Sequence, residues 1–587
     1  MKETLVRLRE EMSREGIDSF IILSEDAHQS EYVAPYWRAR AYVSGFTGSA
    51  GTLVVTRDKA GLWTDGRYFL QAAAQLEGSG IDLMKMAEPG VPTWQEWLLA
   101  ETPAGGRAGI DGRTLGSFTA AALTKKLAEK GITLALDDLS QRIWPDRPAL
   151  PEAPIFDLPA AYTGESRGAR IARLRGHMAQ IGARYYLVCS LESSAWLLNY
   201  RGGDVADTPV AYAYTLVGPE RSTLFIEPEK VPAELKKAFA KDGIDLVSYH
   251  AAAEELAKVE EPIAYDPILI SVKLRAVLSD KARKIEEREA PLIWRAVKTE
   301  TERENLREAH RKDGAVMVRF IRTIKETVKQ KSLREDEIAD ILDAMRCAEP
   351  ESLGISFATI AGYEDNGAII HYAPQPGLGK ATEAKGFLLV DSGAQYLQGT
   401  TDITRTIALG ELSEKQKRIY TLVLKGHIAL GRAIFREGTT GPKLDILARE
   451  PLWENGLDYK HGTGHGVGYL LSVHEGPHSI NTSNNSVALV PGMVVTNEPG
   501  FYEAGEFGVR IENMELVRER SVTEWGKFYD FETLTLVPYE REAIVKELLS
   551  ADEIAWIDAY HKRVREEIGP RLSGDDLAWL IRETEEL

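Results

Sequence analysis

The chain has 587 residues, of which 44% are hydrophobic and 27% are charged, so it is too long for one core and has the composition of globular domains. A formal net charge of −18 argues against nucleic acid or an anionic membrane as a partner. The charged N-terminal segment lacks the apolar core of a secretory signal, and no run of about 18 apolar residues is present. We therefore expect three or four domains in a cytoplasmic protein, with no membrane contact.

Two cysteines are present, Cys189 and Cys347. Such a small number rules out a disulfide framework and fits a reducing compartment. A single bridge between the two cysteines is the alternative.

The first two domains are predicted from an internal repeat. The segment RLREEMSREG begins at Arg7 and recurs as RLRGHMAQIG from Arg173, and each copy leads into an apolar strand. The first copy has the apolar spacing of a helix that ends at Gly16. A linker rich in Pro, Ala and Gly separates the copies. We expect two related α/β domains, residues 1–157 and 158–298, of which the second is a spacer or frame rather than a site.

A charged amphipathic helix is predicted to open the third domain, residues 299–538. The segment TETERENLREAHRKDGAVMVRFIRTI has a solvated face and an apolar face formed by Leu306, Val316, Val318 and Phe320. Further on, the apolar runs 357–360 and 368–370 are expected to be strands, with His371 at the end of the second. Residues 539–587 carry helical apolar stripes and are expected to pack against this domain.

Two acidic residues follow an apolar strand in the third domain. The run 387–390 leads to Asp391, and the alternating segment TTDITRTIAL places Asp402 and Thr404 on one face of the next strand. The connection contains Gly399 and is short enough for a hairpin or a bulged ribbon. This hairpin would bring both carboxylates to one face.

A second acidic pair follows a histidine-rich segment. The strand 493–495 leads to Glu498, and residues 507–517 are expected to return as one strand that carries Glu512. Between the two acidic pairs lies HGTGHGVGYLLSVHEGPH, a glycine-rich loop that would supply His465.

Four acids on apolar strands need a cation. Burying an unpaired carboxylate costs several kcal/mol, and Arg405 and Arg510 are the only strand-borne cations in these segments. Two divalent ions would balance four carboxylates, and oxygen-rich ligands with one imidazole suit Mn²⁺, Co²⁺ or Fe²⁺ better than a structural zinc. The alternative is that these acids lie in solvated loops.

The segments HGTGHGVGYLLSVHEGP, NEPGFYEAGEFGVRIEN, FETLTLVP and LWTDGRYFLQAA resemble those of the pita-bread metallopeptidases. Within that family, the chain is most similar to the long, three-domain, cytosolic type of aminopeptidase P, along nearly its whole length. The resemblance implies an α/β multidomain protein with two creatinase-like N-terminal α/β domains, an α+β pita-bread catalytic domain and a C-terminal helical extension. It also implies a homodimer.

The resemblance implies two divalent metal ions per chain, most often Mn²⁺. Asp391 would bind one metal, Asp402 and Glu512 would bridge the pair, and His465 and Glu498 would complete the other.

The resemblance also assigns residues to catalysis and substrate binding. Glu498 would take the proton of the attacking water, and His371 and His474 would bind the scissile carbonyl or shuttle a proton. The full set of implied substrate contacts is Arg67, His371, His461, His474 and Arg510. For Arg67, a local salt bridge with Asp65 is the alternative. His478 has no implied role, and we expect it at the surface.

The implied activity is hydrolysis of the N-terminal Xaa-Pro bond of peptides, with release of the first residue by attack of a hydroxide held between the metals. One alternative within the enzymes is an Xaa-Pro dipeptidase, or prolidase. The other, from a different class, is a metal-free binding protein built on the same pita-bread fold.

Overall fold

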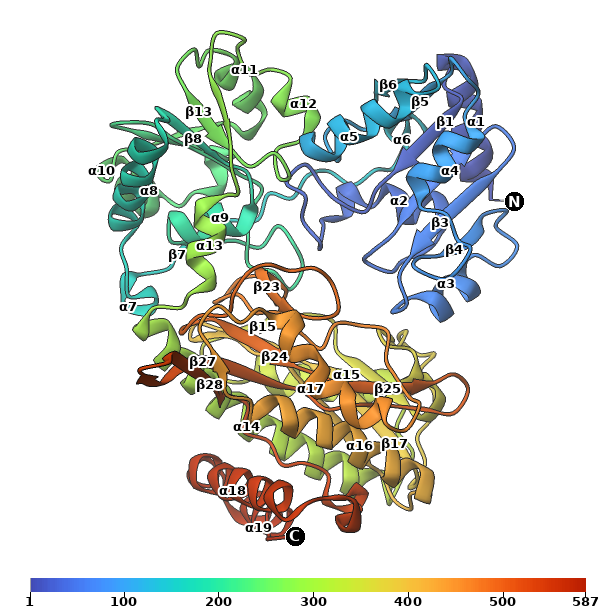
Figure 1. The fold of residues 1–587 in the computed structure, drawn as a ribbon, viewed down its shortest axis with the longest axis vertical. Helices are drawn as coiled ribbons and strands as arrows, with labels where there is room; N and C mark the ends of the chain where they lie inside the picture. Colours follow the sequence, from blue (N-terminus) through green and yellow to red (C-terminus); the bar gives the residue numbers. More distant parts are fainter. Residues whose placement is uncertain (1) are drawn as a thin grey trace. The chain divides into compact units, whose positions relative to one another are not determined.

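The computed structural model describes residues 2–587 and separates them into two compact units (Figure 1). The first unit consists of residues up to 160 together with Glu165–Leu292, and the second of Ala161–Gly164 together with Ile293–Leu587. The short segment belongs to the second unit through hydrogen bonds. The carbonyl of Thr163 accepts one from the hydroxyl of Thr299 at 2.9 Å, and that of Tyr162 accepts one from the Asn305 amide at 3.0 Å. The chain therefore enters the second unit twice.

The first unit contains two six-stranded sheets with the same topology, which confirms the two related α/β domains. Their orders are β4-β3-β2-β1-β5-β6 and β12-β11-β10-β8-β13-β14. In each sheet the strand that follows the repeat, β1 or β8, pairs antiparallel with one neighbour and parallel with the other. The bounds are β1 (Ser19–Ile22), β2 (Thr52–Thr56), β3 (Ala60–Thr64), β4 (Asp82–Lys85), β5 (Arg107–Ile110), β6 (Thr133–Leu136), β8 (Tyr185–Val188), β10 (Tyr214–Val217), β11 (Ser222–Phe225), β12 (Ile244–Val247), β13 (Ile263–Tyr265) and β14 (Lys284–Glu286).

The repeated segments are the helices that precede these strands. Helix α1 (Glu3–Glu15) ends at Gly16, and α8 (Arg167–Ile181) ends at Gly182. Both glycines have positive φ, near 64° and 72°, so a residue with a side chain would be strained there. The shared glycine thus stops each helix and turns the chain into the central strand of its sheet.

The second unit begins with α14 (Glu300–Val328), as predicted. A capping box between Thr299 and Glu302 fixes its first turn. All four side chains predicted to face inward are buried: Leu306, Val316, Val318 and Phe320. Helices α16 (Glu414–Gly431) and α17 (Gly441–Trp453) lie beside the strands in the same unit (Figure 1).

Two sheets carry the strands of interest in this unit. One has the order β16-β17-β20 and the other β21-β28-β27-β24-β22-β23. Their bounds are β16 (Ile360–Tyr363), β17 (Phe387–Ser392), β20 (Ile403–Ala408), β21 (Phe435–Arg436), β22 (Gly464–Gly466), β23 (Glu475–Ile480), β24 (Val494–Asn497), β27 (Asn513–Thr523) and β28 (Gly526–Thr533).

The strand predicted over residues 507–517 is two strands. The first, β26 (Phe507–Arg510), pairs with β25 (Gly500–Glu503), whereas β27 pairs with β24. The chain therefore changes partner at Ile511 and Glu512, which lie in neither strand. The prediction failed because one continuous pattern of apolar residues covers two strands that pair with different neighbours.

The strands predicted around residues 357–370 are also partly wrong. Only β16 forms there, and it is followed by η4, a 3₁₀ turn over Glu364–Ala368. The side chain of Asn366 and the backbone N–H of Tyr363 both donate to the carboxylate of Glu335. These side-chain bonds hold the turn, and His371 consequently lies in a turn rather than at a strand end.

The C-terminal extension packs against the catalytic domain, as predicted. Helices α18 (Ala551–Ile568) and α19 (Gly574–Glu583) bury six side chains in its core: Ile557, Tyr560, Val564, Ile568, Trp579 and Leu580. The preceding stretch with Ile544 and Leu548 forms 3₁₀ turns instead of an α-helix.

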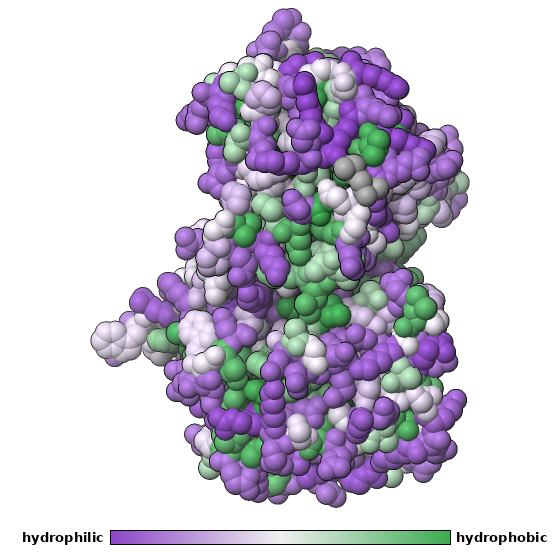
Figure 2. All heavy atoms as spheres, turned by 90° about the vertical axis from the view of Figure 1, so that its right-hand side faces the viewer, coloured by the Kyte–Doolittle hydropathy of each residue, from purple (hydrophilic) through white to green (hydrophobic). Residues whose placement is uncertain are grey.

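Hydrophilic residues predominate on the face of the molecule in Figure 2, and hydrophobic ones gather there in smaller patches. Among residues 2–587, no helix has both the length and the apolar composition needed to cross a bilayer. Cys189 is buried and Cys347 is exposed, and both are free thiols, so the alternative of a bridge between them is not realised.

Candidate metal centre

The first acidic pair lies on adjacent strands. Asp391 is in β17, and Asp402 directly precedes β20, where Asp391 pairs in register with Thr404. The connection between them forms its own ribbon, in which β18 (Ala394–Tyr396) pairs with β19 (Gly399–Thr400). Alternation along β20 then directs Asp402 and Thr404 to the same side of the sheet.

The second pair and His465 come from the larger sheet. Glu498 follows β24, and Glu512 lies at the change of partner before β27. His465 is in β22, a short strand within the segment that was predicted to be a loop. The hydroxyl of Thr496 donates to Glu498 Oε1 at 3.1 Å, which orients that carboxylate.

These side chains converge on one point. Asp402, His465 and Glu512 each offer a ligand atom within 4.8 Å of the others. Nε2 of His465 is 3.5 Å from Oδ2 of Asp402 and 3.5 Å from Oε1 of Glu498. Asp391 completes the cluster, because its charge raises the pKa of Asp402, Glu498 and Glu512.

In the absence of a cation, burial disfavours the ionised forms of Asp402, Glu498 and Glu512. It is the main cause that raises the pKa values of Asp402 and Glu512 well above their ordinary range, and neighbouring carboxylates add to the effect. Burial likewise raises the pKa of Glu498 to about 7, although Arg510 opposes the shift. Oδ1 of Asp391 is buried with no hydrogen-bond partner. Four carboxylates and one imidazole are a donor set that fits divalent metal ions.

The tautomer of His465 suits a metal ligand. Its Nδ1 is 2.9 Å from the carbonyl oxygen of Gly466, to which it can only donate, so Nε2 presents its lone pair to the acids. His474, the residue before β23, stacks edge-on against His465 with ring centroids 4.3 Å apart.

Arg510 is built into the cluster. Its side chain is buried, and Nη2 donates to Oδ2 of Asp391 at 2.7 Å. Nη1 donates to the hydroxyl of Tyr502 at 2.7 Å, and Nε donates to that of Thr404 at 3.2 Å. One of the two strand-borne cations therefore offsets part of the acidic charge directly.

His461 and His371 lie around this cluster. His461 has Nε2 2.8 Å from the hydroxyl of Tyr502 and Nδ1 3.9 Å from Oε2 of Glu498. The carbonyl of Ile370, next to His371, accepts a hydrogen bond from Arg510 at 3.4 Å.

Arg67 lies in the first unit and forms the alternative salt bridge. Its Nε and Nη2 both donate to the Asp65 carboxylate at 2.8 Å. The guanidinium also stacks on Tyr68, at 5.4 Å from the ring centroid.

The prediction that His478 lies at the surface is wrong. His478 is buried in β23, with Nε2 2.8 Å from the carbonyl oxygen of Val494. Burial lowers its pKa to about 4, so the ring is neutral. The ring fits because Gly466 lies opposite, where a Cβ would come within 2.6 Å of it.

Several supporting residues were missed from the sequence. Glu475, directly after His474, has a buried carboxylate that binds Lys298 and, at 2.6 Å, Nη1 of Arg295. Tyr502 links His461 to Arg510. For Thr404, the alternation with Asp402 was the available signal, whereas nothing in the sequence pairs Glu475 with two cations 177 and 180 positions away.

Comparisons with known proteins identify relatives along the whole chain. The family model described as "Metallopeptidase family M24" matches residues 304–519, and the model of the C-terminal region of that family matches residues 527–587. Two family models of the creatinase/prolidase N-terminal domain match residues 5–147 and 146–302. A probable Xaa-Pro aminopeptidase P of Chaetomium globosum is 41% identical over 99% of this chain and 98% of its own.

Two solved structures are also similar. An X-prolyl aminopeptidase from Caenorhabditis elegans, described as a cytosolic enzyme with a di-nuclear active site, matches with a TM-score of 0.95 at 33% identity over 100% of this chain and 99% of its own. An Xaa-Pro dipeptidase from Bacillus anthracis matches with a TM-score of 0.51 at 26% identity, over 64% of this chain and 99% of its own.

Proposed function

This chain belongs to metallopeptidase family M24, and we propose that it is an Xaa-Pro aminopeptidase that releases the first residue from peptides with proline in the second position. The observation that carries the proposal is the convergence of Asp402, His465, Glu498 and Glu512 on one point. Relatives with this activity in their names extend along the whole chain, whereas the Bacillus dipeptidase covers 64% of it. That difference favours an aminopeptidase over a prolidase.

We propose that five residues hold two divalent metal ions, with Mn²⁺ as the native metal. Asp391 would bind one ion, Asp402 and Glu512 would bridge both, and His465 and Glu498 would complete the other. Oxygen ligands with a single imidazole favour Mn²⁺ over a zinc site rich in Cys and His. When bound, the ions would lower the pKa of a water molecule and polarise the scissile carbonyl.

The protein's own groups would move the protons. Glu498 would accept the proton of the attacking water through its carboxylate, which lies beside the proposed metal site. Its Oε1 is already oriented by Thr496. His474 and His371 would stabilise the carbonyl oxygen or pass a proton to the leaving nitrogen.

The substrate-binding groups are proposed from the same arrangement. His461 would line the pocket for proline, beside Tyr502. Arg510 would act by holding Asp391 and by adding positive charge near the bound peptide. Arg67 would contact substrate from the N-terminal domain, after exchanging its bond to Asp65.

Proline specificity has a physical reason in such a site. An Xaa-Pro bond is a tertiary amide without an N–H, so peptidases that bind that N–H lose a contact. A two-metal site can bind the free α-amine and the carbonyl oxygen instead, and the missing donor then has no cost.

We further propose that the chain is a cytoplasmic homodimer with domains at 1–157, 158–298, 299–538 and 539–587. The Caenorhabditis relative is described as cytosolic, which supports the location. Size-exclusion chromatography with light scattering measures the oligomeric state, and a single-chain mass would contradict the dimer.

Activity is tested with three substrates and added Mn²⁺. The peptide Arg-Pro-Pro should release arginine, an Xaa-Pro dipeptide should be a poorer substrate, and an Xaa-Ala peptide should be a control that is not cleaved. Preference for the dipeptide would establish a prolidase instead. Absence of both metal binding and hydrolysis would establish a metal-free binding protein.

A further inference from the structure

Arg405 is a buried cation whose guanidinium contacts the backbone around the proposed metal ligands. Nη1 donates to the carbonyl oxygens of Thr404 and Glu512, at 2.9 and 2.7 Å. Nη2 donates to Oδ1 of Asn513, the residue after Glu512, at 2.8 Å. The guanidinium thus binds two consecutive residues of the segment that supplies one proposed bridging ligand.

The side chain lies on the opposite face of β20 from the acids. Thr404 and Thr406 face the cluster, because their hydroxyls donate to Glu512 Oε2 and to the Arg510 carbonyl, at 2.7 and 2.9 Å. Since strand side chains alternate, Arg405 points the other way. It therefore reaches the ligand-bearing segments from behind, where it cannot touch a substrate.

Arg405 also bridges two sheets. Strand β20 belongs to the smaller sheet, and Glu512 leads into β27 of the larger one. The two segments meet at one backbone bond, from the N–H of Glu512 to the carbonyl of Thr404 at 3.1 Å. Nη1 of Arg405 binds that same carbonyl oxygen and the carbonyl oxygen of Glu512. The guanidinium thereby fixes the distance between the strands that carry Asp402 and Glu512.

On its other side Arg405 is held by the C-terminal part of the chain. Its Nη2 donates to the carbonyl of Val537 at 2.8 Å and to the hydroxyl of Tyr560, on α18, at 3.2 Å. The same hydroxyl accepts from the N–H of Val537 and lies 3.0 Å from the carbonyl oxygen of Thr535. Tyr560 therefore aligns both the guanidinium and the segment that binds it.

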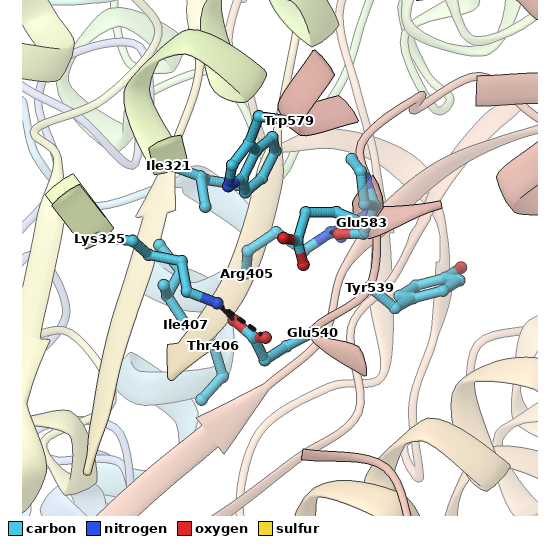
Figure 3. A pocket seen from close by; sticks show the side chains of 10 residues that line it. Ile321, Lys325, Arg405, Thr406, Ile407, Tyr539, Glu540, Trp579 and Glu583 are labelled. Carbon is cyan, nitrogen blue, oxygen red and sulfur yellow. Dashed lines mark hydrogen bonds and ion pairs between the residues drawn. The ribbon is translucent and has the colours of Figure 1, made fainter. Parts of the chain in front are cut away.

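Other residues around Arg405 also connect β20 to the C-terminal part of the chain (Figure 3). A cavity of about 20 Å³ is lined by Arg405, by Tyr539 and Glu540, and by Trp579 from α19. The carboxylate of Glu540 accepts from Lys325 of α14 at 3.0 Å and from the N–H of Ala408, at the end of β20, also at 3.0 Å. Residues 537–540 thus hold β20 at two points, Arg405 and Ala408.

We propose that Arg405 is a positioning residue for the metal ligands and that the C-terminal extension acts on the metal centre through the contact between Arg405 and Tyr560. The proposal rests on the function proposed above, since it takes Asp402 and Glu512 as ligands. Loss of the contact would let the two ligand-bearing strands separate. Metal affinity would then fall even though every ligand remains.

The test compares Tyr560→Phe, Arg405→Lys and the double variant in the full-length protein. Each metal-free protein is titrated with Mn²⁺ by calorimetry. Groups that orient metal ligands typically contribute about 10–100-fold in affinity, and we expect a loss in that range for each single variant. Because both changes disrupt one contact, the double variant should bind little more weakly than Arg405→Lys alone.

Tyr363→Phe is the matched control. Tyr363 is buried in the same unit, and its hydroxyl donates to the carbonyl of Lys385 at 3.1 Å, with no contact to Arg405. Both phenylalanine variants lose a hydrogen bond from a tyrosine hydroxyl to a backbone carbonyl, so both should melt at lower temperature without metal. Only Tyr560→Phe should lose Mn²⁺ affinity. The visible spectrum of bound Co²⁺, which reports ligand geometry, should change in Tyr560→Phe and stay unchanged in Tyr363→Phe.

An affinity within twofold of wild type in Tyr560→Phe, with an unchanged Co²⁺ spectrum, would overturn the proposal. If Arg405→Lys does not fold, Tyr560→Phe alone decides. The proposed function fails separately: wild-type protein that binds two Mn²⁺ ions but does not cleave Arg-Pro-Pro would contradict the activity and leave the role of Arg405 standing.

Discussion

The hydroxyl of Thr404 donates a hydrogen bond of 2.7 Å to Oε2 of Glu512. It joins two sheets at the point where their acidic side chains meet. One oxygen of a proposed bridging ligand is therefore oriented by a neutral group of the opposite sheet. This hydrogen bond orients the carboxylate without a metal, so its charge is the variable that experiments can isolate.

Neutralising a bridging acid should have opposite effects with and without metal. In Asp402→Asn and Glu512→Gln we expect hydrolysis to be abolished and metal content to fall. Without metal the same variants should melt at higher temperature than wild type, because one of several mutually repelling buried acids is gone. Elemental analysis, rate assays and melting curves measure the three effects.

The control for these variants is Glu524→Gln, in the exposed turn after β27. It makes the same chemical change away from the cluster and should alter none of the three quantities. Wild-type rates from Asp402→Asn with verified metal loading would refute its assignment as a bridging ligand.

Metal removal should destabilise the protein more as the pH rises. The pKa of Glu498 in the folded protein is raised to about 7, and burial also raises those of Asp402 and Glu512 well above their ordinary values. Such acids favour folding below about pH 4 and lose that contribution as the pH passes the folded pKa. For Glu498 alone, a rise from 4.5 to about 7 corresponds to about 3 kcal/mol.

Melting curves with chelator at pH 5.5, 7 and 8 test this expectation against curves with Mn²⁺. Metal bound to the native state stabilises it by mass action, so the difference between the two series should widen with pH. A difference that narrows toward pH 8 would show that the acids are not buried together.

Substitutions of His474 and His465 should have different effects on rate and on metal content. His474→Ala should lower kcat by about 10²–10⁴-fold, the usual contribution of a general acid–base group, with metal content near that of wild type. His465→Ala should lose one metal ion and, with it, activity. Rates and metal content are measured on both variants. If His474→Ala lost metal and His465→Ala kept both ions, the roles of the two histidines would be the reverse of those proposed.

A buried histidine should make the protein sensitive to acid. Burial lowers the pKa of His561 to about 3, and neighbouring arginines contribute. Below its ordinary pKa near 6.5 the unfolded chain binds a proton that the folded protein does not, so stability falls as the pH decreases. At pH 5 this amounts to about 2 kcal/mol.

His561→Gln keeps a polar side chain at this position and removes the titration. Its melting temperature should fall less between pH 7 and pH 5 than that of wild type. The exposed His250→Gln should behave as wild type does, and an equal fall in all three proteins would exclude His561 as the cause.

The sequence predicted local features well because local rules determine them. The stop of α1 at Gly16, the inward face of α14 and the shared face of Asp402 and Thr404 all follow from glycine conformation and side-chain periodicity. The two related domains followed from one repeated segment. The four acids lie in or directly beside strands, as the apolar runs around them predicted.

Non-local features were not predictable in this way. The break at Glu512 depends on which strand lies beside each half of the segment 507–517. His478 is buried because Gly466, on the neighbouring strand β22, makes room for its ring, and the polarity of a histidine alone could not indicate that pairing. The role of Arg405 required knowing that residues 535–538 and 560 lie behind β20.

The double entry of the chain into the second unit has a consequence for dissecting the protein. A fragment that starts at Ile293 would contain the proposed ligands but would lack Tyr162 and Thr163, which bind Asn305 and Thr299 at the start of α14. The catalytic half is thus not a contiguous stretch of sequence. A fragment that keeps it intact must also carry residues 161–164, which come from the start of the second N-terminal domain.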